Sequence, residues 1–403
     1  MTVKINKSTA QGTVFAPPSK SMAHRYLICA ALSENSCVKG IDFSKDIEAT
    51  LNCLDALGCQ FKKENNTVTL GGIDFKHLNS TELFCNESGS TLRFMIPICL
   101  LFDSEITLTG TERLFSRSLS VYEKLCNEQG FEFEQQDNSL KIKGKLKSGK
   151  YTVRGDISSQ FISGLMFALP LLSGDSTIEI EGNLESASYL SLTIKALADF
   201  GVRIRRTDEK TFYIKGSQSY KNKALSVEGD YSNAAFFEAL NVLGSKVTVA
   251  GLSDSSVQGD MVYKEIFPLL SIACPTVDIS DCPDLAPILM AVAAAKNGAV
   301  FTGTRRLKIK ESDRGQAMKE ELAKLGCEVY VEDNRITVQK AELTTPIVPI
   351  YGHNDHRIVM SMAVLLTLTG GEILGAQAVS KSFPDFFSRF KALGIDAEVK
   401  EDI

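Results

Sequence analysis

The sequence predicts an α/β (α+β) protein in which one βαβαβ-type unit occurs six times, with the helices enclosed by outer strands. Six short β-patterned segments each end in glycine, at Gly40, Gly110, Gly182, Gly251, Gly303 and Gly375. Their spacings are 70, 72, 69, 52 and 72 residues, and self-similarity at a nearly fixed period indicates a repeat architecture. An apolar stretch of helical length precedes each segment. Nearly every face of these stretches is apolar, which is typical of buried helices.

The elements of one repeat follow in a regular order. An apolar helix such as RFMIPICLLF or LAPILMAVAAAKNG leads into the strand that ends in glycine. In five repeats a second helix then ends in glycine, as in LDALGC, LAKLGC and FKALGI, and a charged strand follows. Glycine there suits a left-handed C-cap, because it has no Cβ to clash. The short interval between Gly251 and Gly303 indicates a fourth repeat that has lost part of this pattern.

The length of the chain predicts two domains, with three repeats in each. A chain of 403 residues exceeds what one hydrophobic core usually serves. The candidate hinges are FAPPSK, around Pro17 and Pro18, and LSVEGD, around Gly229. We therefore expect a discontinuous domain of residues 1–17 plus 226–403 and a second domain of residues 18–225. Two hinge strands at one place would suit a clamshell motion.

The composition is that of a soluble globular protein, with 44% apolar and 23% charged residues. The net charge of −5 provides no overall field that would recruit nucleic acid or an anionic membrane, so an anionic ligand needs a local cluster of cations. No signal peptide is evident, and the longest apolar runs are too short to span a bilayer. Ten cysteines occur without a Cys-x-x-Cys pair, so we expect reduced thiols, a cytoplasmic location and no metal site.

Cations stand where the apolar helices are expected to begin. Ser, Asp and Asn in PPSKSMAHR, NESGSTLR and HNDHR are explained by N-capping, but Lys20, Arg25, Arg93 and Arg357 are not. A cation opposes the helix dipole at an N-terminus unless an anion also binds there, where the backbone N–H groups favour it. The sequence therefore indicates several anion-binding helix starts.

Each of these motifs also has a simpler explanation. Lys20 and Ser21 could form an exposed first turn, and Arg117 could belong to a solvated loop. In LKIKESDRG, Lys310 and Arg314 are four residues apart and Glu311 and Arg314 are three apart, a spacing at which Glu311 and Arg314 could form an ordinary surface ion pair. His353 and His356 would more simply be structural partners than metal ligands. Only the joint occurrence of the motifs at corresponding positions of a repeat gives them weight.

Six motifs together resemble a known family. SKSMAHR, ESGSTLR, SSQF, KESDR, NDHR and KSFPDF, in this order, are similar to 5-enolpyruvylshikimate-3-phosphate (EPSP) synthase, also called 3-phosphoshikimate 1-carboxyvinyltransferase. The resemblance runs from about Gly12 to Phe387. It implies a two-domain, inverse α/β barrel-like fold of six βαβαββ repeats, three per domain, with the substrates bound in a cleft between the domains.

The resemblance also implies a reaction. The enolpyruvyl group of phosphoenolpyruvate would pass to the 5-hydroxyl of shikimate 3-phosphate, with release of phosphate, on the shikimate pathway to chorismate and the aromatic amino acids. No cofactor and no metal would be needed. The partners would be these two small molecules, without nucleic acid or membrane, and we expect a monomer. The two substrates bring two phosphates and two carboxylates, which is what the cation clusters require.

The site residues implied by the resemblance fall into three groups. Shikimate 3-phosphate would be bound by Lys20, Ser21, Arg25, Ser158, Ser159, Gln160, Ser186, Tyr189, Asp284 and Lys310. Phosphoenolpyruvate would be bound by Lys20, Gly89, Arg117, Gln160, Arg314, Arg357 and Lys381. The catalytic residues would be Lys20, Asp284 and Glu311. Most of the first group falls in residues 18–225, and the discontinuous domain holds phosphoenolpyruvate-side residues. Pro18, Glu87 and Arg306 depart from common family patterns, which leaves the affinities open.

Two other functions compete with this one. The sister enolpyruvyl transferase that acts on UDP-N-acetylglucosamine uses a loop cysteine in a Pro-Gly-Gly-Cys context, whereas the loop here, LTGTERLFSRSL, has none. A non-enzymatic repeat scaffold would not concentrate Lys and Arg at helix starts in both halves.

Overall fold

The computed structural model describes residues 1–401, which form two compact units. Unit 1 comprises Met1–Pro17 and Gly229–Ile403, and unit 2 is Pro18–Glu228. The chain therefore passes between the units twice, after Pro17 and after Glu228. Each unit has a hydrophobic core of its own, so each is described by itself.

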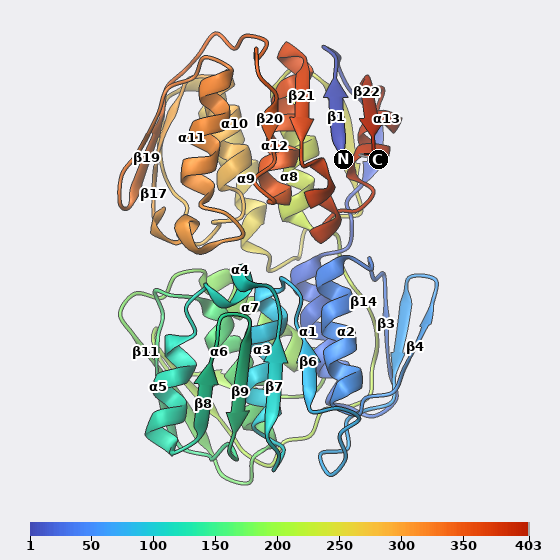
Figure 1. The fold of residues 1–403 in the computed structure, drawn as a ribbon, viewed down its shortest axis with the longest axis vertical. Coiled ribbons are helices and arrows are strands. Elements are labelled where there is room, and N and C mark those ends of the chain that lie inside the picture. The colour runs from blue at the N-terminus through green and yellow to red at the C-terminus, as the bar shows by residue number, and fades with distance from the viewer. Residues whose placement is uncertain (402–403) are drawn as a thin grey trace. The chain divides into compact units, whose positions relative to one another are not determined.

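Unit 2 contains three four-stranded sheets with one strand order (Figure 1). In each sheet a parallel pair of strands is extended by two antiparallel strands. The strands are β3 (Ser36–Lys39), β4 (Phe61–Glu64), β5 (Thr67–Leu70) and β14 (Ala224–Ser226) in the first sheet, β6 (Glu82–Phe84), β7 (Ile106–Thr109), β8 (Glu132–Gln135) and β9 (Ser139–Lys143) in the second, and β10 (Lys150–Arg154), β11 (Ser176–Glu181), β12 (Ile204–Arg206) and β13 (Thr211–Ile214) in the third.

The helices of unit 2 connect these strands. They are α1 (Lys20–Ala31), α2 (Lys45–Ala56), α3 (Gly89–Cys99), α4 (Glu112–Phe115), α5 (Ser120–Gln129), α6 (Ser159–Ala168) with the 3-10 turn η1 (Leu169–Leu171), and α7 (Ala187–Asp199). Helix α3 packs on α6, and α1 packs on α7. The first strand of the first sheet, β14, comes from the end of the unit and lies parallel to β3.

Unit 1 repeats the same design with one reduced sheet. Its strands are β1 (Thr2–Ile5), β20 (Ile350–Tyr351), β21 (Gly371–Leu374) and β22 (Ala397–Lys400) in one sheet, β16 (Thr276–Asp278), β17 (Ala299–Thr302), β18 (Val329–Val331) and β19 (Arg335–Val338) in another, and β2 (Gln11–Phe15) with β15 (Lys246–Ala250) in the third. The two-stranded sheet belongs to the repeat with the short glycine interval, so the prediction of a shortened fourth repeat is confirmed.

The helices of unit 1 are α8 (Tyr231–Val242), η2 (Gly259–Val262), α9 (Tyr263–Ile272), α10 (Ala286–Ala295), η3 (Arg305–Ile309), α11 (Arg314–Lys324), α12 (His356–Thr369), η4 (Ala376–Lys381) and α13 (Phe386–Ala392). Helices α8, α10 and α12 pack on one another. Nine of the ten residues of α10 are buried, which agrees with its apolar sequence. Because a fully buried Leu, Ile or Phe side chain contributes about 1.5–3 kcal/mol, these enclosed helices are the main source of stability in each core.

The predicted repeat fold with buried helices is confirmed. The sheets stay separate, and the strands of residues 1–401 form no closed barrel. Glycine and cap positions also follow the prediction where they can be compared. For example, α5 ends at Gly130 in the left-handed conformation, with φ of 74°. The chain ends meet in one sheet, where β1 lies between β21 and β22.

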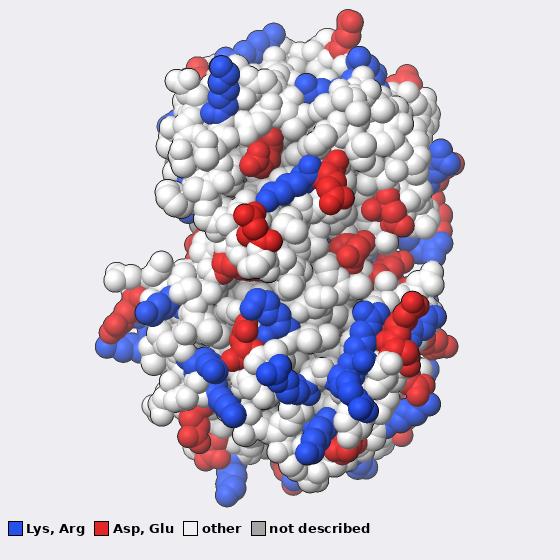
Figure 2. All heavy atoms as spheres, turned by 180° about the vertical axis from the view of Figure 1, so that it is seen from behind, with Lys and Arg blue, Asp and Glu red and all other residues white. Residues whose placement is uncertain are grey.

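Charges of both signs are distributed over the protein surface. Figure 2 shows Lys and Arg interspersed with Asp and Glu over the face opposite that of Figure 1. No helix formed by the described residues is long and apolar enough to cross a lipid bilayer. The ten cysteines are all free thiols, and eight of them are buried.

Candidate active site

Three buried helices of unit 2 begin with a serine cap. The hydroxyls of Ser19, Ser88 and Ser158 accept from the backbone N–H groups of Met22, Thr91 and Gln160, at 3.4, 3.2 and 3.3 Å. Each cap satisfies one of the N–H groups that a helix start leaves unpaired. The capping explanation therefore holds for the serines, and the cations nearby need another one.

The motif SKSMAHR places a buried guanidinium between two helices. Arg25 is 2% exposed and donates to Thr193 Oγ1 at 2.8 Å, to the Ser21 carbonyl at 2.7 Å and to the Tyr189 carbonyl at 3.1 Å. Burial lowers the pKa of Arg25 to about 10, which leaves it charged at neutral pH. Lys20, in the first turn, is 2.8 Å from the carboxylate of Asp46, and its side chain is only 18% exposed. The motif is therefore not a solvated first turn.

A second group of cations surrounds the start of α3. Arg93 donates to Gln160 Oε1 at 2.8 Å, and the Gln160 amide donates to Ser90 Oγ at 2.8 Å. A Cβ built on Gly89 would lie 2.8 Å from Arg117 NH1, so the guanidinium of Arg117 rests directly on this glycine. Arg117 is 8% exposed and its buried Nε has no hydrogen-bond partner. An unsatisfied buried guanidinium N–H is costly unless a ligand completes it, which favours an anion at this position.

The loop before α7 is held in a strained conformation. Ser186 is buried and has φ of 57°, in the left-handed region that residues other than glycine rarely adopt. Such residues cost of order 1–3 kcal/mol and persist where the surroundings hold them, often at ligand sites. Ser158 and Ser159, at the start of α6, are also buried. Apart from Arg25, in the second turn of α1, and Arg117, which follows α4, the unit 2 residues that the resemblance implies lie at or near helix starts.

In unit 1 one carboxylate joins three cations. Asp284 lies 2.8 Å from Arg314 NH1, 3.2 Å from Lys310 Nζ and 3.1 Å from Arg357 NH2. Burial alone would raise the pKa of Asp284, but Arg357, Lys310 and Arg314 outweigh it and hold the pKa well below its usual value. Burial lowers the pKa of Lys310 to about 8, against the opposing charge of Asp284. The carboxylate is thus ionised at neutral pH, and Lys310 is the cation closest to releasing its proton.

The guanidinium of Arg314 sits at the centre of a carboxylate cage. It is 1% exposed and contacts Asp355 at 2.9 Å, Asp284 at 2.8 Å and Glu311 at 2.8 Å. Burial lowers the pKa of Arg314, but the three carboxylates outweigh burial and raise it. The pair Glu311–Arg314 has the predicted helical spacing, yet Arg314 is buried, so the solvated-surface explanation of KESDR is wrong for this residue.

The two remaining cations of this network, Arg357 and Lys381, are also held by hydrogen bonds. Arg357 donates to Ser232 Oγ at 2.7 Å and to the Asp284 carbonyl at 3.1 Å. Lys381 Nζ donates to the Asn354 carbonyl at 2.8 Å and is 8% exposed. The motifs PDL, KESDR, NDHR and KSF, which are far apart in the sequence, therefore meet in one network.

Sequence reasoning missed several members of these clusters. The sequence pattern explains Asp355 only as a helix cap, but its side chain also accepts a hydrogen bond from Arg314. Asp46 and Ser232 carry no motif signal. Asp260 is buried, and burial followed by the charge of Asp284 raises its pKa to about 7. Its one available signal was its place in QGD, just before a helical segment, which alone does not indicate a site.

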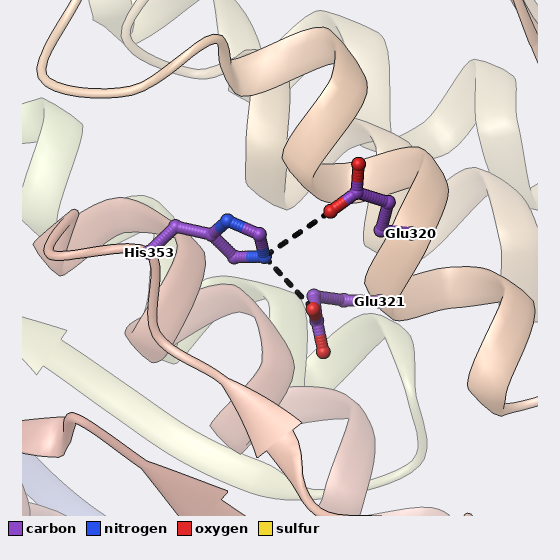
Figure 3. A group of neighbouring side chains, drawn as sticks. All are labelled: Glu320, Glu321 and His353. Atoms are coloured by element: carbon purple, nitrogen blue, oxygen red, sulfur yellow. Dashed lines mark hydrogen bonds and ion pairs between the residues drawn. The ribbon is translucent and has the colours of Figure 1, made fainter.

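The described residues include side chains that lie close enough together to hold a metal ion. One group there, Glu320, Glu321 and His353, has ligand atoms within 4.8 Å of one another (Figure 3). It lies outside the two networks. Lys324 Nζ is 2.7 Å from Glu321 Oε2, so an ammonium already neutralises this buried carboxylate.

Comparison with solved structures identifies the fold. The fold is shared with EPSP synthase from Acinetobacter baumannii, with a TM-score of 0.80 at 22% identity over 99% of this chain and 100% of that one. It is also shared with the enolpyruvyl transferase NikO from Streptomyces tendae, with a TM-score of 0.76 at 12% identity over 98% of each chain. The architecture is therefore that of the enolpyruvyl transferases.

Sequence comparison identifies the family within this class. The family model described as EPSP synthase (3-phosphoshikimate 1-carboxyvinyltransferase) matches residues 5–390. Proteins named 3-phosphoshikimate 1-carboxyvinyltransferase from Clostridium kluyveri and Clostridium perfringens are each 41% identical, covering 97% of this chain and 97% and 98% of theirs. The chain belongs to the EPSP synthase family, as its motifs predict. Its reaction is transfer of the enolpyruvyl group of phosphoenolpyruvate to shikimate 3-phosphate, in the shikimate pathway.

Proposed function

We propose that the two networks are the two halves of the machinery for this reaction and that each carries the residue roles implied by the motifs. One observation supports the proposal above the others: in each unit, motifs distant in sequence are joined by hydrogen bonds. Arg25 of SKSMAHR reaches Tyr189 of SASY, and Arg93 of ESGSTLR reaches Gln160 of SSQ. Helix capping alone gives Arg93 and Gln160 no reason to share a hydrogen bond between their side chains.

Shikimate 3-phosphate is assigned mainly to unit 2. Its phosphate and carboxylate need donors with lasting positive charge, and Arg25 supplies a buried guanidinium whose described partners are all neutral. The full set proposed is Lys20, Ser21, Arg25, Ser158, Ser159, Gln160, Ser186 and Tyr189, with Asp284 and Lys310 from unit 1. Asp284 is the acceptor suited to a substrate hydroxyl, because it is held ionised.

Phosphoenolpyruvate is assigned to cations from both units. Arginine suits its phosphate and carboxylate because the planar guanidinium can donate two parallel hydrogen bonds. The set proposed is Lys20, Gly89, Arg117 and Gln160 from unit 2 with Arg314, Arg357 and Lys381 from unit 1. Gly89 belongs to this set because a side chain there would push against Arg117.

The proposed chemistry needs one proton donor and one acceptor. Glu311 would protonate the methylene carbon of phosphoenolpyruvate, which makes C2 electrophilic. The 5-hydroxyl would attack C2 as its proton moves toward Asp284, with Lys20 assisting. The tetrahedral intermediate then expels phosphate while the new methyl group returns a proton to Glu311, which restores the enol double bond. Glu311 is held 2.8 Å from Arg314 NH2, so the guanidinium that fixes its direction also stabilises its ionised form after the transfer.

The test of the residue roles uses release of phosphate from mixtures of both substrates. Arg25→Ala should lower kcat/KM by about 10³-fold or more, mostly through the KM for shikimate 3-phosphate, because it removes a buried charge-assisted contact. The burial of Arg25 means that melting will also fall, so Arg25→Lys, which keeps the charge, is the matched control. An Arg25→Ala enzyme with an unchanged KM for shikimate 3-phosphate would remove the assignment.

We propose that the enzyme acts as a monomer in the cytoplasm, because the residues assigned to both substrates lie within one chain and its ten thiols are free. Sedimentation of the active enzyme at assay concentration tests the first point. An activity that fell on dilution together with the mass would contradict it.

A further inference from the structure

The turn that leads into α12 has an unusual backbone. His353 and Asn354 are consecutive residues with φ of 48° and 50°, both in the left-handed region. Left-handed residues other than glycine cost of order 1–3 kcal/mol each, and they persist only where neighbouring contacts hold them. We define the turn as Gly352–Asp355. Some part of the surrounding structure must therefore keep this turn in place.

The turn supplies contacts to three of the cations assigned to phosphoenolpyruvate. Asp355, its last residue, caps Arg357 by accepting from the backbone N–H at 2.9 Å. The same side chain accepts from Arg314 Nε at 2.9 Å. The carbonyl of Asn354 accepts from Lys381 Nζ at 2.8 Å. A shift of this turn would therefore move Arg314, Arg357 and Lys381 together.

One buried carboxylate holds the other side of the turn. Glu321 is 1% exposed, and its Oε1 lies 2.8 Å from His353 Nε2 (Figure 3). Its Oε2 accepts from the Tyr351 backbone N–H at 2.9 Å and from Lys324 Nζ at 2.7 Å. Burial raises the pKa of Glu321, but the hydrogen bonds from His353, Lys324 and Tyr351 outweigh burial and lower it. The carboxylate thus holds the chain by hydrogen bonds at Tyr351, before the turn, and at His353, within it.

Glu321 also connects the turn to the helix that carries the caged arginine. It lies on α11, which begins at Arg314, seven residues earlier. At 1.5 Å per residue this separation is about 10 Å along the helix axis, too far for Glu321 to touch an anion beside Arg314. Any effect of Glu321 on the substrate must therefore act through the position of the turn and of α11.

We infer that Glu321 and His353 form a positioning pair, which sets the places of Arg314, Arg357 and Lys381 by holding the turn Gly352–Asp355 against α11. The inference rests on the proposed role of these three cations in binding phosphoenolpyruvate. It goes beyond that role because neither Glu321 nor His353 belongs to the substrate-binding set. The pair acts mainly on affinity for phosphoenolpyruvate, because most of the residues assigned to shikimate 3-phosphate lie in unit 2.

A metal-binding role is the alternative for the same side chains. Glu320 Oε2 is 3.9 Å from His353 Nε2, so the three ligand atoms could be drawn around a divalent ion. Two observations favour the positioning role. First, the ammonium of Lys324 already pairs with Glu321. Second, the side chain of Glu320 is 49% exposed, and the positioning role needs only the buried carboxylate of Glu321.

The test compares Glu321→Gln, His353→Asn and the matched control Glu320→Gln in the steady-state assay. Asn tolerates the left-handed conformation, so His353→Asn removes the ring without adding backbone strain. Glu321→Gln and His353→Asn should each raise the KM for phosphoenolpyruvate about tenfold, with the KM for shikimate 3-phosphate within twofold of wild type. Glu320→Gln should change neither, because it removes only an exposed charge.

Three outcomes would overturn the inference. The first is a lower melting temperature of both variants with an unchanged KM for phosphoenolpyruvate, which would make the pair structural only. The second is an equal rise in both KM values. The third is loss of wild-type activity in EDTA with recovery in Zn²⁺, which would make the group a metal site. Arg357→Lys separates the inference from the proposed function: if this variant keeps its KM for phosphoenolpyruvate, the assigned site itself is wrong.

Discussion

The most buried guanidinium groups of the two networks are held in opposite ways. In unit 1 the buried guanidinium of Arg314 contacts three carboxylates. In unit 2 the buried guanidinium of Arg25 contacts one hydroxyl and two carbonyl oxygens. The pKa values follow this difference: burial lowers that of Arg25 to about 10, whereas for Arg314 the carboxylates overcome burial and raise it. The charge of Arg25 is thus left for a ligand, and that of Arg314 is balanced within the protein.

The difference predicts two kinds of contribution to catalysis. A buried cation with neutral partners gains the most when an anion binds, because the anion supplies the missing countercharge. A cation shared among carboxylates gains less from the anion, but its direction is fixed before the substrate arrives, as preorganised electrostatic stabilisation requires. We therefore expect unit 2 to contribute mainly affinity and the unit 1 network to contribute mainly orientation and proton transfer.

The largest effect should come from breaking the unit 1 network at its centre. Asp284→Ala leaves three neighbouring cations without their shared carboxylate and removes the proposed proton acceptor. We expect kcat to fall by about 10²–10⁴-fold and unfolding to cost about 3–5 kcal/mol less. The exposed pair Glu332–Arg335, 3.8 Å apart, provides the control, since Glu332→Gln should change stability by less than about 1 kcal/mol. Near-normal kcat in Asp284→Ala would show that the network does not take part in the chemistry.

A smaller effect should follow from crowding the guanidinium of Arg117 in unit 2. In Gly89→Ala the new Cβ would meet Arg117 NH1 at 2.8 Å and Arg93 NH1 at 3.1 Å, so both guanidinium groups must move. We expect the KM for phosphoenolpyruvate to rise about tenfold or more, with little change in melting temperature, because the ends of flexible side chains can shift cheaply. Gly71→Ala is the control, since the nearest atom to its Cβ would be 3.4 Å away. Equal KM values for the two variants would place Arg117 outside the substrate site.

The repeat fold could be predicted from sequence because it rests on patterns that are local in the chain. The apolar helices, the glycine at each strand end and the short fourth repeat are all visible as spacing. The pairing of strands that are distant in the sequence could not be predicted. Strand β1 completes the C-terminal sheet and β14 completes the first sheet of unit 2, and these pairings join segments more than 180 residues apart. Nothing in a local pattern specifies a partner at that distance.

The candidate site was predictable only for residues inside recognisable motifs. Lys20, Arg25 and Arg357 stand out because cations near a helix start need an explanation, whereas Lys310 and Arg314 are indicated only by the motif KESDR. The carboxylates that hold them do not stand out, because Asp at a helix start already has an explanation as a cap. Asp355 performs both tasks at once, accepting from the Arg357 N–H and from Arg314 Nε. The residue types in a motif therefore do not reveal the side-chain networks between repeats, which are seen only in the three-dimensional structure.

The smallest effect concerns pH and the buried acid Asp260. Its pKa is raised to about 7, first by burial and then by the charge of Asp284, whereas an unfolded Asp titrates near 3.8. Between about pH 4 and pH 7 the folded protein keeps a proton that the unfolded chain releases, so this group lowers stability as the pH rises, and the full penalty is present above pH 7. Asp260→Asn carries no such proton. Its melting temperature relative to wild type should therefore be a few degrees higher at pH 8 than at pH 5. If the difference in melting temperature did not depend on pH, Asp260 would already be ionised in the folded enzyme. Unit 1 would then hold one more carboxylate balanced by its cations, which would widen the contrast with unit 2.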